Sequence, residues 1–231
     1  MCLIVRGARG VPRFVSTAAV ALSIAACTQA PTPPTTTTAP STPSVRVTPA
    51  NIERARGELP DGYEVADVSG RVSPAAFWGF GPDWLADPPQ CGALAEPVAD
   101  GATTRGWSGS GPGGIVYAVV TGSPPAQVGF DPALIAECGQ WTLAGGHTTG
   151  AVALVDAPAI DAAATVGMVT EAKTVVEGGT ETNSRGYTVT AYLGDYLAFV
   201  TVVTDPGSPN PPLGQDFAAA LLVKTVSALR G

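Results

Sequence analysis

The sequence predicts an α+β fold in which an antiparallel β-sheet packs with an N-terminal and a C-terminal helix. Residues 48–59 and 215–229 have the apolar spacing of amphipathic helices. Residues 186–204 alternate between apolar and polar side chains and form the clearest hairpin. Helices at both ends of a run of short strands favour an antiparallel sheet over alternating strand–helix units.

The N-terminal helix is predicted from its capping residues. Thr48 suits the N-cap and Pro49 the first helical position, and Ile52, Ala55 and Leu59 then share one face. Residues 63–68 alternate as a strand, and a short helix is expected over residues 73–78, before a Gly/Pro/aromatic loop at 79–89.

The central region predicts short strands and one short helix. Strands are expected at 105–108, 114–121 and 151–156, and a helix begins at Asp131-Pro132 and runs to residue 138. Residues 162–168 fit helix or strand equally well, and residues 173–180 alternate weakly.

The hairpin and the last helix follow. Gly194-Asp195 separates the hairpin strands and suits a type II′ turn, whose first central residue needs a positive φ. The C-terminal helix carries one apolar stripe, formed by Phe217, Leu221, Leu222, Val226 and Leu229.

Composition excludes several classes of protein. The chain has 231 residues, of which 45% are hydrophobic and 13% charged, and its formal net charge is −7. A disordered polyelectrolyte would have fewer apolar residues, and a nucleic-acid-binding protein would need a basic surface. No apolar run reaches the roughly 20 residues of a spanning helix, which excludes a polytopic membrane protein.

Residues 1–26 are typical of a secretory signal peptide. Arg6, Arg9 and Arg13 precede a short apolar run at 14–24, and small residues follow it. Residues 22–27 resemble a bacterial lipobox, a signal in which the cysteine sulfur receives diacylglycerol and the new amine is often acylated, for example with palmitate. Cys27 is therefore the expected lipidation site. An ordinary cleaved signal peptide and a retained anchor are the alternatives.

Residues 27–45 form the predicted lipidated cysteine and a Thr/Pro-rich disordered linker, and residues 46–231 a single extracytoplasmic domain. The linker is a solvated spacer, with an O-glycosylated stalk or a PxxP ligand as alternatives. Cleavage removes three of the 12 basic residues and none of the 19 acidic ones, which leaves a charge of −10. We therefore expect the domain to stand away from anionic lipid, on the extracytoplasmic face of the cell membrane.

Two cysteines remain for the domain. Cys91 and Cys138 are 47 residues apart and in an exported protein most simply pair as a disulfide. A redox or metal site is the weaker alternative, because the sequence has no CxxC motif and His147 is its one histidine.

No catalytic motif is found, and we expect no enzyme activity and no cofactor. Residues 106–110 resemble a nucleophile elbow, but Ser110 stands where the second glycine of G-x-S-x-G belongs. His147 lies in a Gly-rich loop at 145–150 without a partner set, and the other Gly-rich runs lack the residues of a phosphate-binding loop.

The tryptophans remain as candidate ligand residues. They lie near Gly/Pro loops or the two cysteines, so they either pack around the bridge or line an aromatic cleft for a small molecule, a glycan or a lipid. The candidate ligand-binding residues are Trp78, Trp84, Arg105, Trp107, Trp141 and His147.

The combination of lipobox, Thr/Pro stalk and a domain with Cys91 in DPPQC and Cys138 in AECG resembles mycobacterial cell-envelope lipoproteins of uncharacterised function. Residues 47–231 are more distantly similar to the extracellular sensor domain of PknH-type kinases. That family implies an α+β fold with an antiparallel sheet, a cleft and two disulfides, whereas this domain has cysteines for one.

The sequence therefore predicts a membrane-anchored envelope lipoprotein with a non-catalytic, ligand-binding or sensor-like domain. The alternative is a protein-interaction or scaffold lipoprotein, for which no protein partner can be named.

Overall fold

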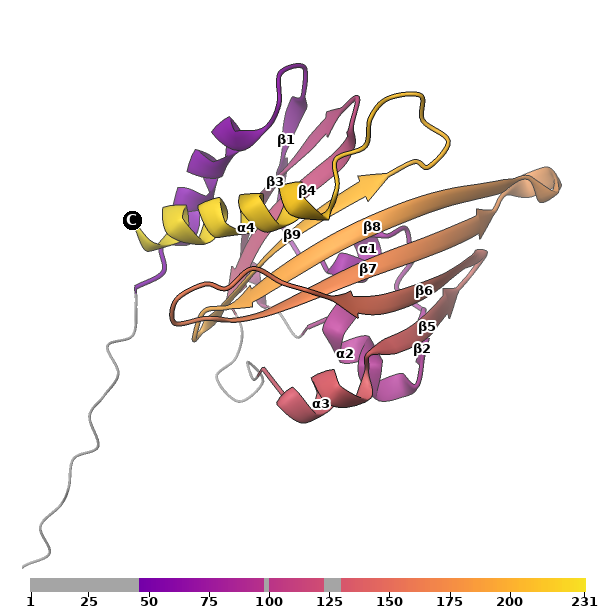
Figure 1. Ribbon diagram of the computed structural model, residues 1–231, viewed down its shortest axis with the longest axis horizontal. Coiled ribbons are helices and arrows are strands. Elements are labelled where there is room, and N and C mark those ends of the chain that lie inside the picture. Colours follow the sequence, from indigo (N-terminus) through magenta and orange to yellow (C-terminus); the bar gives the residue numbers. More distant parts are fainter. Residues whose placement is uncertain (1–45, 98–99, 123–129) are drawn as a thin grey trace, which may run out of the picture. The chain divides into compact units, whose positions relative to one another are not determined.

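A computed structural model describes residues 46–97, 100–122 and 130–231. Nine antiparallel strands form one sheet in the order β1-β3-β4-β9-β8-β7-β6-β5-β2 (Figure 1). The α+β class is thus confirmed. The signal peptide, Cys27 and the linker lie outside the described residues. No helix in the described part of the chain is long and apolar enough to cross a membrane.

The strands have the following bounds: β1 Glu64–Val68, β2 Leu85–Asp87, β3 Asp100–Gly111, β4 Gly114–Gly122, β5 Gln140–Gly145, β6 Thr148–Val155, β7 Ala164–Val175, β8 Glu181–Tyr192 and β9 Tyr196–Thr204. The α-helices are α1 Pro74–Phe77, α2 Gly92–Ala95, α3 Pro132–Glu137 and α4 Gln215–Arg230. The 3-10 helices are η1 Pro49–Glu58, η2 Pro89–Cys91 and η3 Glu177–Gly179.

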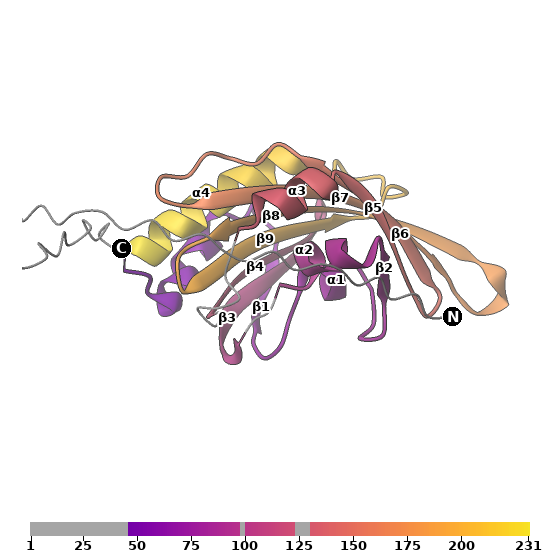
Figure 2. The ribbon, with the colours of Figure 1, turned by 90° about the horizontal axis from the view of Figure 1, so that it is seen from below.

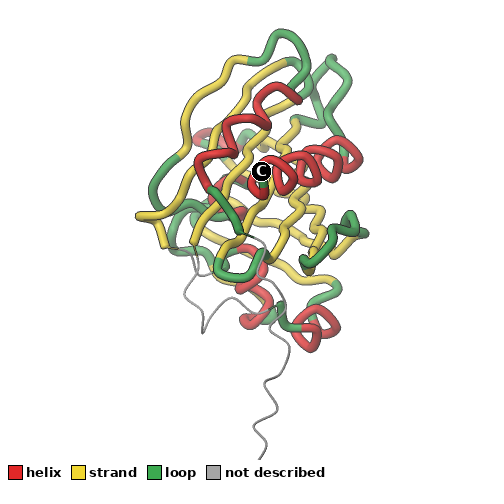
Figure 3. The backbone as a smooth tube through the Cα atoms, turned by 90° about the vertical axis from the view of Figure 1, so that its left-hand side faces the viewer, coloured by secondary structure: helices red, strands yellow, loops and turns green. Residues whose placement is uncertain are grey.

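One side of the sheet, which we call the α4 face, is covered by α4 and η1. The two helices lie side by side near the C-terminus (Figure 3), where the Thr48 amide donates to the Leu229 carbonyl at 2.8 Å. The core beneath them includes Trp107 of β3, alternate residues of β4, β8 and β9, and Leu221, Leu222 and Val226 of α4. The predicted apolar stripe of the last helix is therefore the one that is buried.

The opposite side, the disulfide face, is covered by α1, α2 and the segments around the disulfide (Figure 2). Cys91 and Cys138 are bonded, as predicted, and both are fully buried. Trp78, Trp141 and Met168 belong to the same cluster. The disulfide joins η2 to the residue that follows α3, beside the pairing of β2 with β5.

The covers of the two faces are offset along the sheet. On the α4 face, the core ends near β8, and Thr142 of β5, Thr149 of β6 and Ala151 of β6 are exposed. On the disulfide face, the exposed end is the other one, where Ile115 of β4 retains 37% of its accessible surface. The α4 face thus has one covered and one open half, whereas the disulfide face is exposed mainly over β1 and the neighbouring ends of β3 and β4.

Several predicted elements differ from the structure. The first helix is a 3-10 helix, which fits its two buried residues, Ile52 and Ala55, because residues three apart align in this helix type. Of the region 162–168, which fitted helix or strand, residues 164–168 are strand, and the expected loop at 145–150 is mostly strand, closed by a turn at 146–147. The loop prediction was wrong because glycines here sit under neighbouring side chains, as Gly150 does under Leu143 and Phe80.

We expect Gly106→Ala to lower the free energy of unfolding by about 1–3 kcal/mol, because an added Cβ would meet the Ala118 carbonyl oxygen at 2.5 Å. Gly57→Ala is the matched control, since nothing lies within 4 Å of its Cβ position. Urea denaturation followed by tryptophan fluorescence measures both. Equal effects of the two substitutions would contradict the close strand approach.

Removal of the disulfide by Cys91→Ser with Cys138→Ser is expected to cost up to about 4 kcal/mol, the loop-closure entropy for a 47-residue separation. The readout is the urea midpoint of the double variant against the oxidised wild-type domain. A midpoint equal to that of the wild type would show that the bridge does not constrain the unfolded chain.

Candidate functional site

The candidate site is a groove on the open half of the α4 face. Its floor is a straight row of side chains, one from each of six neighbouring strands, which we call the central row. Successive pairings align it across the sheet: Asp87, Thr142, Ala151, Glu171, Arg185 and Thr204. The row runs from the edge strand β2 to the end of β9.

Two further rows flank the central row on the same face. Because side chains alternate between faces, residues two positions away along each strand lie on the same face, although Val202 is buried in the core beneath α4. One flanking row contains Leu85, Ala144, Thr149, Lys173 and Asn183, and the other contains Gln140, Ala153, Val169, Tyr187 and Val202. The side chains that β5 and β6 contribute to the floor are small, so they rise little above the sheet there.

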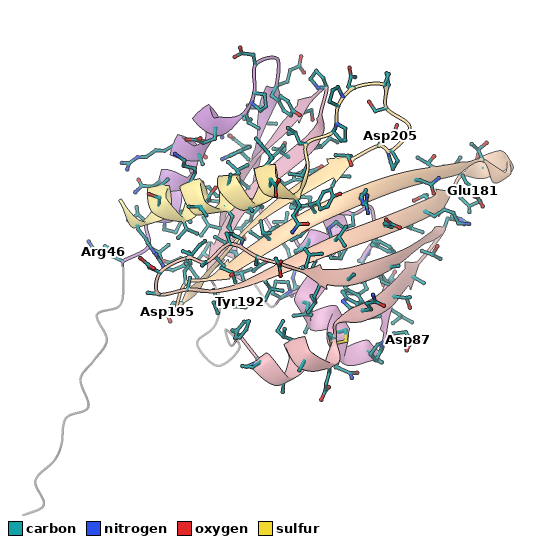
Figure 4. The ribbon with its side chains drawn as sticks, in the orientation of Figure 1. Arg46, Asp87, Glu181, Tyr192, Asp195 and Asp205 are labelled. Atoms are coloured by element: carbon teal, nitrogen blue, oxygen red, sulfur yellow. A yellow bond between two sulfur atoms is a disulfide. The ribbon has the colours of Figure 1, made fainter. Side chains whose placement is uncertain are left out.

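A cavity of about 860 Å³ lies between this floor and residues 205–214, which connect β9 to α4. Figure 4 shows Asp205 on this connection and Glu181 near the tip of the neighbouring β7–β8 hairpin. The Leu213 amide donates to the Gly113 carbonyl at 2.9 Å, and the Gln215 side chain donates to the Asp156 carbonyl at 3.1 Å. The wall is therefore held at its base by two other parts of the chain.

Two ion pairs join the cations of the groove to carboxylates. Arg185 pairs with Glu171 at 2.9 Å and lies over the Tyr187 ring at 5.6 Å from its centroid. Lys173 pairs with Glu181 at 3.1 Å. The lining of the 860 Å³ cavity holds two cations and two carboxylates, the fourth group being Asp205, and its remaining polar groups are amides and hydroxyls. Asp87 of the central row and Glu181 lie just outside this lining, so the groove as a whole has more carboxylates than cations.

Three of the four tryptophans gather on the disulfide face, beneath the sheet from the groove. Trp78 and Trp141 are buried, and the Trp78 indole donates to Thr188 at 3.0 Å. Trp84 lies 6.4 Å from Trp141 between ring centroids and donates to Glu96 at 3.2 Å. This grouping corresponds to packing around the bridge.

The other candidate residues are not brought together with them. Trp107 is fully buried on the α4 face, where its indole donates to the Ile52 carbonyl at 3.1 Å. Arg105 is exposed on β3, and His147 is exposed in the β5–β6 turn. A cavity of about 450 Å³ is lined by Trp84 with Phe80, Arg71 and Glu96, so an aromatic-lined cavity exists but contains a single tryptophan.

Sequence reasoning missed the groove residues Glu171, Lys173, Arg185 and Tyr187. Their signal was present: charged, amide or tyrosine side chains occupy every second position in 171–173 and 181–187, which indicates a polar strand face. Strands were only weakly predicted in these two segments, so the alternation could not be assigned to one face of a strand.

Among the described residues, neither a shifted pKa nor a cluster of metal-ligating side chains indicates a second functional site. Burial raises the pKa of Tyr117 and of Tyr192, whose rings lie on the disulfide face. Burial also raises the pKa of Tyr63, against the smaller opposing effect of the Gly113 amide. Within 46–97, 100–122 and 130–231, no three His, Cys, Asp or Glu side chains gather as a metal site would require.

Comparisons with known proteins agree with the expected resemblance. The X-ray structure of an uncharacterised protein from Mycobacterium smegmatis, an Rv0999 orthologue, is 21% identical, with a TM-score of 0.59 over 82% of this chain and 99% of that chain. The extracellular domain of PknH from Mycobacterium tuberculosis is 13% identical, with a TM-score of 0.45 over 79% of this chain and 93% of that one.

No curated protein matches the sequence. The family model for a domain of unknown function, DUF5642, matches residues 48–230, which is nearly the whole folded domain. The chain therefore belongs to the DUF5642 family.

Proposed function

We propose that this protein is a lipid-anchored, extracytoplasmic binding protein whose groove on the α4 face takes a neutral, hydroxyl-rich ligand of the cell envelope, such as a glycan. The observation that carries the proposal is the 860 Å³ cavity with paired charges and many amide and hydroxyl groups. A neutral ligand can exchange hydrogen bonds with such a surface without burying an unpaired charge.

The lining disfavours the other ligand classes. An acyl chain laid along the groove would desolvate Glu171, Lys173 and Arg185 without replacing their hydrogen bonds. A strongly anionic ligand would find both cations already paired with carboxylates.

The scaffold alternative has less support. The exposed large apolar side chains of the described residues are Val65 of β1, Leu85 of β2, Ile115 of β4, Val175 and Val176 at the end of β7, and Val223 of α4. They are distributed over both edges of the sheet, one strand end, β4 and a helix, so they do not form the single broad apolar patch that a protein partner would cover.

Anchoring through Cys27 predicts that Cys27→Ser moves the protein from the detergent phase to the aqueous phase in a Triton X-114 partition of expressing cells. The cause is the loss of the acyl chains, each of whose methylenes contributes about 0.8 kcal/mol to membrane binding. Cys2→Ser is the control, since Cys2 lies in the expected signal peptide. A Cys27→Ser protein that stays in the detergent phase would contradict the anchor.

Binding in the groove is tested by isothermal titration calorimetry with the tetrasaccharides of N-acetylglucosamine and of α-1,6-mannose. We expect Arg185→Ala to weaken binding about tenfold, as the loss of a hydrogen bond to a charged group does. The matched control Arg54→Ala, on the exposed side of η1, should bind as the wild type does.

Arg185→Ala should remain folded, because its ion pair with Glu171 is solvent-exposed and contributes at most about 1 kcal/mol. Absence of binding heat with both sugars, or an equal loss in both variants, would overturn the proposed groove function.

A further inference from the structure

Strand β8 extends beyond the end of β9 (Figure 1). The ladder between the two strands ends at the pair Arg185–Thr204, whereas the ladder between β8 and β7 continues to Glu181. Within the described chain, residues 181–184 therefore have a paired strand on one side and none on the other. We call this segment the free edge. It belongs to the fifth of the nine strands, in the middle of the sheet.

The hydrogen-bonding pattern of β8 shows which backbone groups point out from the free edge. The Leu193 amide donates to the Tyr196 carbonyl at 2.8 Å, and bonded pairs recur at every second residue of an antiparallel ladder. Odd-numbered residues of β8 therefore bond towards β9 and even-numbered ones towards β7, as the 2.9 Å bond from the Val176 amide to the Thr180 carbonyl confirms. The N–H and C=O of Asn183 thus point to the side where β9 has ended.

The connection from β9 to α4 does not complete this ladder. In the register of β8 with β9, the residue opposite Asn183 is Pro206, which has no N–H to donate. The Asp205 side chain accepts from the Gly207 amide at 2.7 Å, and the Asp205 carbonyl accepts from the Ser208 amide at 3.0 Å, so the chain turns here. Among the residues that the structure describes, no backbone hydrogen bond joins this turn to the free edge.

Open space borders the free edge on each side of the sheet. The 860 Å³ cavity of the α4 face and a separate cavity of about 560 Å³ both have Asn183, Ser184 and Asp205 in their linings. The smaller cavity is also lined by Ile115 and Val203, whose side chains lie on the disulfide face, and Ile115 is exposed there. An extended segment beside the free edge would place alternate side chains over these two surfaces.

The two surfaces differ in chemistry. The disulfide face offers apolar contact with Ile115 and Val203. The α4 face carries the carboxylate of Glu181, and Asp205 adds a second carboxylate that has no ion pair within the described chain. The three residues at 182–184 are Thr, Asn and Ser, so they lack the charges and prolines with which strand edges commonly block pairing.

We infer that the free edge binds an extended segment of a partner protein as an additional strand, in the place where β9 would continue. The backbone of this segment bonds to Glu181 and Asn183. Its apolar side chains contact Ile115 and Val203, and a basic side chain between them faces the carboxylates. The inference is independent of the glycan proposal, and a short strand needs a free edge instead of a broad apolar patch.

Amide hydrogen exchange of the intact, disulfide-bonded protein, followed by NMR, tests the free edge directly. The Asn183 amide should exchange at about the rate of an unstructured peptide, and the amides of Thr182 and Ser184, which bond to β7, at least about tenfold more slowly. A blocked pentapeptide Thr-Ile-Lys-Ile-Thr at millimolar concentration should slow the Asn183 amide at least about tenfold. An Asn183 amide that is slow without the peptide, or that stays fast with it, would overturn the inference.

Calorimetry with the same peptide separates backbone pairing from side-chain contact. Asn183→Pro removes the N–H that points to the partner and keeps the bonds to β7, so it should weaken binding about tenfold, whereas Asn183→Ala should bind the peptide within about twofold of the wild type. Equal affinities of the two variants would contradict strand pairing.

An N-methylated peptide gives the same test on the unaltered protein, so it does not depend on the folding of a variant. Methylation of the Lys nitrogen, which faces Asn183, should weaken binding about tenfold. Methylation of the following Ile nitrogen, which points away from β8, should have little effect, since neighbouring residues of a strand bond in opposite directions. Equal effects of the two methyl groups would show that the peptide does not bind as a strand.

Discussion

The width of the sheet is the constraint on which the rest of the structure depends. Nine strands at about 4.8 Å spacing span about 38 Å, whereas α4, with 16 residues, is about 24 Å long and one helix wide. The covering segments therefore leave part of each face exposed, and the offset between them keeps β9 and residues 186–191 of β8 largely buried on both sides. The α4 face has an open half because the sheet is wider than the helices that cover it.

An open half-face must remain soluble and must not pair with other sheets. The central row meets this requirement with Thr, Ala and charged side chains, whereas Leu85 on the edge strand β2 exposes a large apolar side chain, and the polar composition of the row makes the surface suitable for a hydroxyl-rich ligand. The disulfide, on the other face, fixes the segments whose tryptophans pack beneath β5, β6 and β7. The rigid covered half thus supports the floor of the groove.

Much of the fold could be predicted from local patterns. The C-terminal helix, the hairpin around Gly194 and the Cys91–Cys138 bridge follow from apolar spacing, turn chemistry and cysteine number, and Gly194 does have a positive φ of 70°. The groove could not be predicted, because the row from Asp87 to Thr204 joins residues more than 100 positions apart through strand pairing. The tryptophans predicted the site less well, because large aromatic side chains also pack in a hydrophobic core.

The most direct test of the open half-face is the alkylation rate of a single introduced thiol in the intact domain with its native disulfide. Ala151→Cys places a thiol on the exposed central row, and Ala118→Cys places one on the same face beneath the helical cover. Iodoacetamide should modify Ala151→Cys at about the rate of an unstructured peptide and Ala118→Cys at least about a hundredfold more slowly, since the latter requires opening of the core. Equally slow modification at both positions would show that the half-face is covered and would contradict the groove.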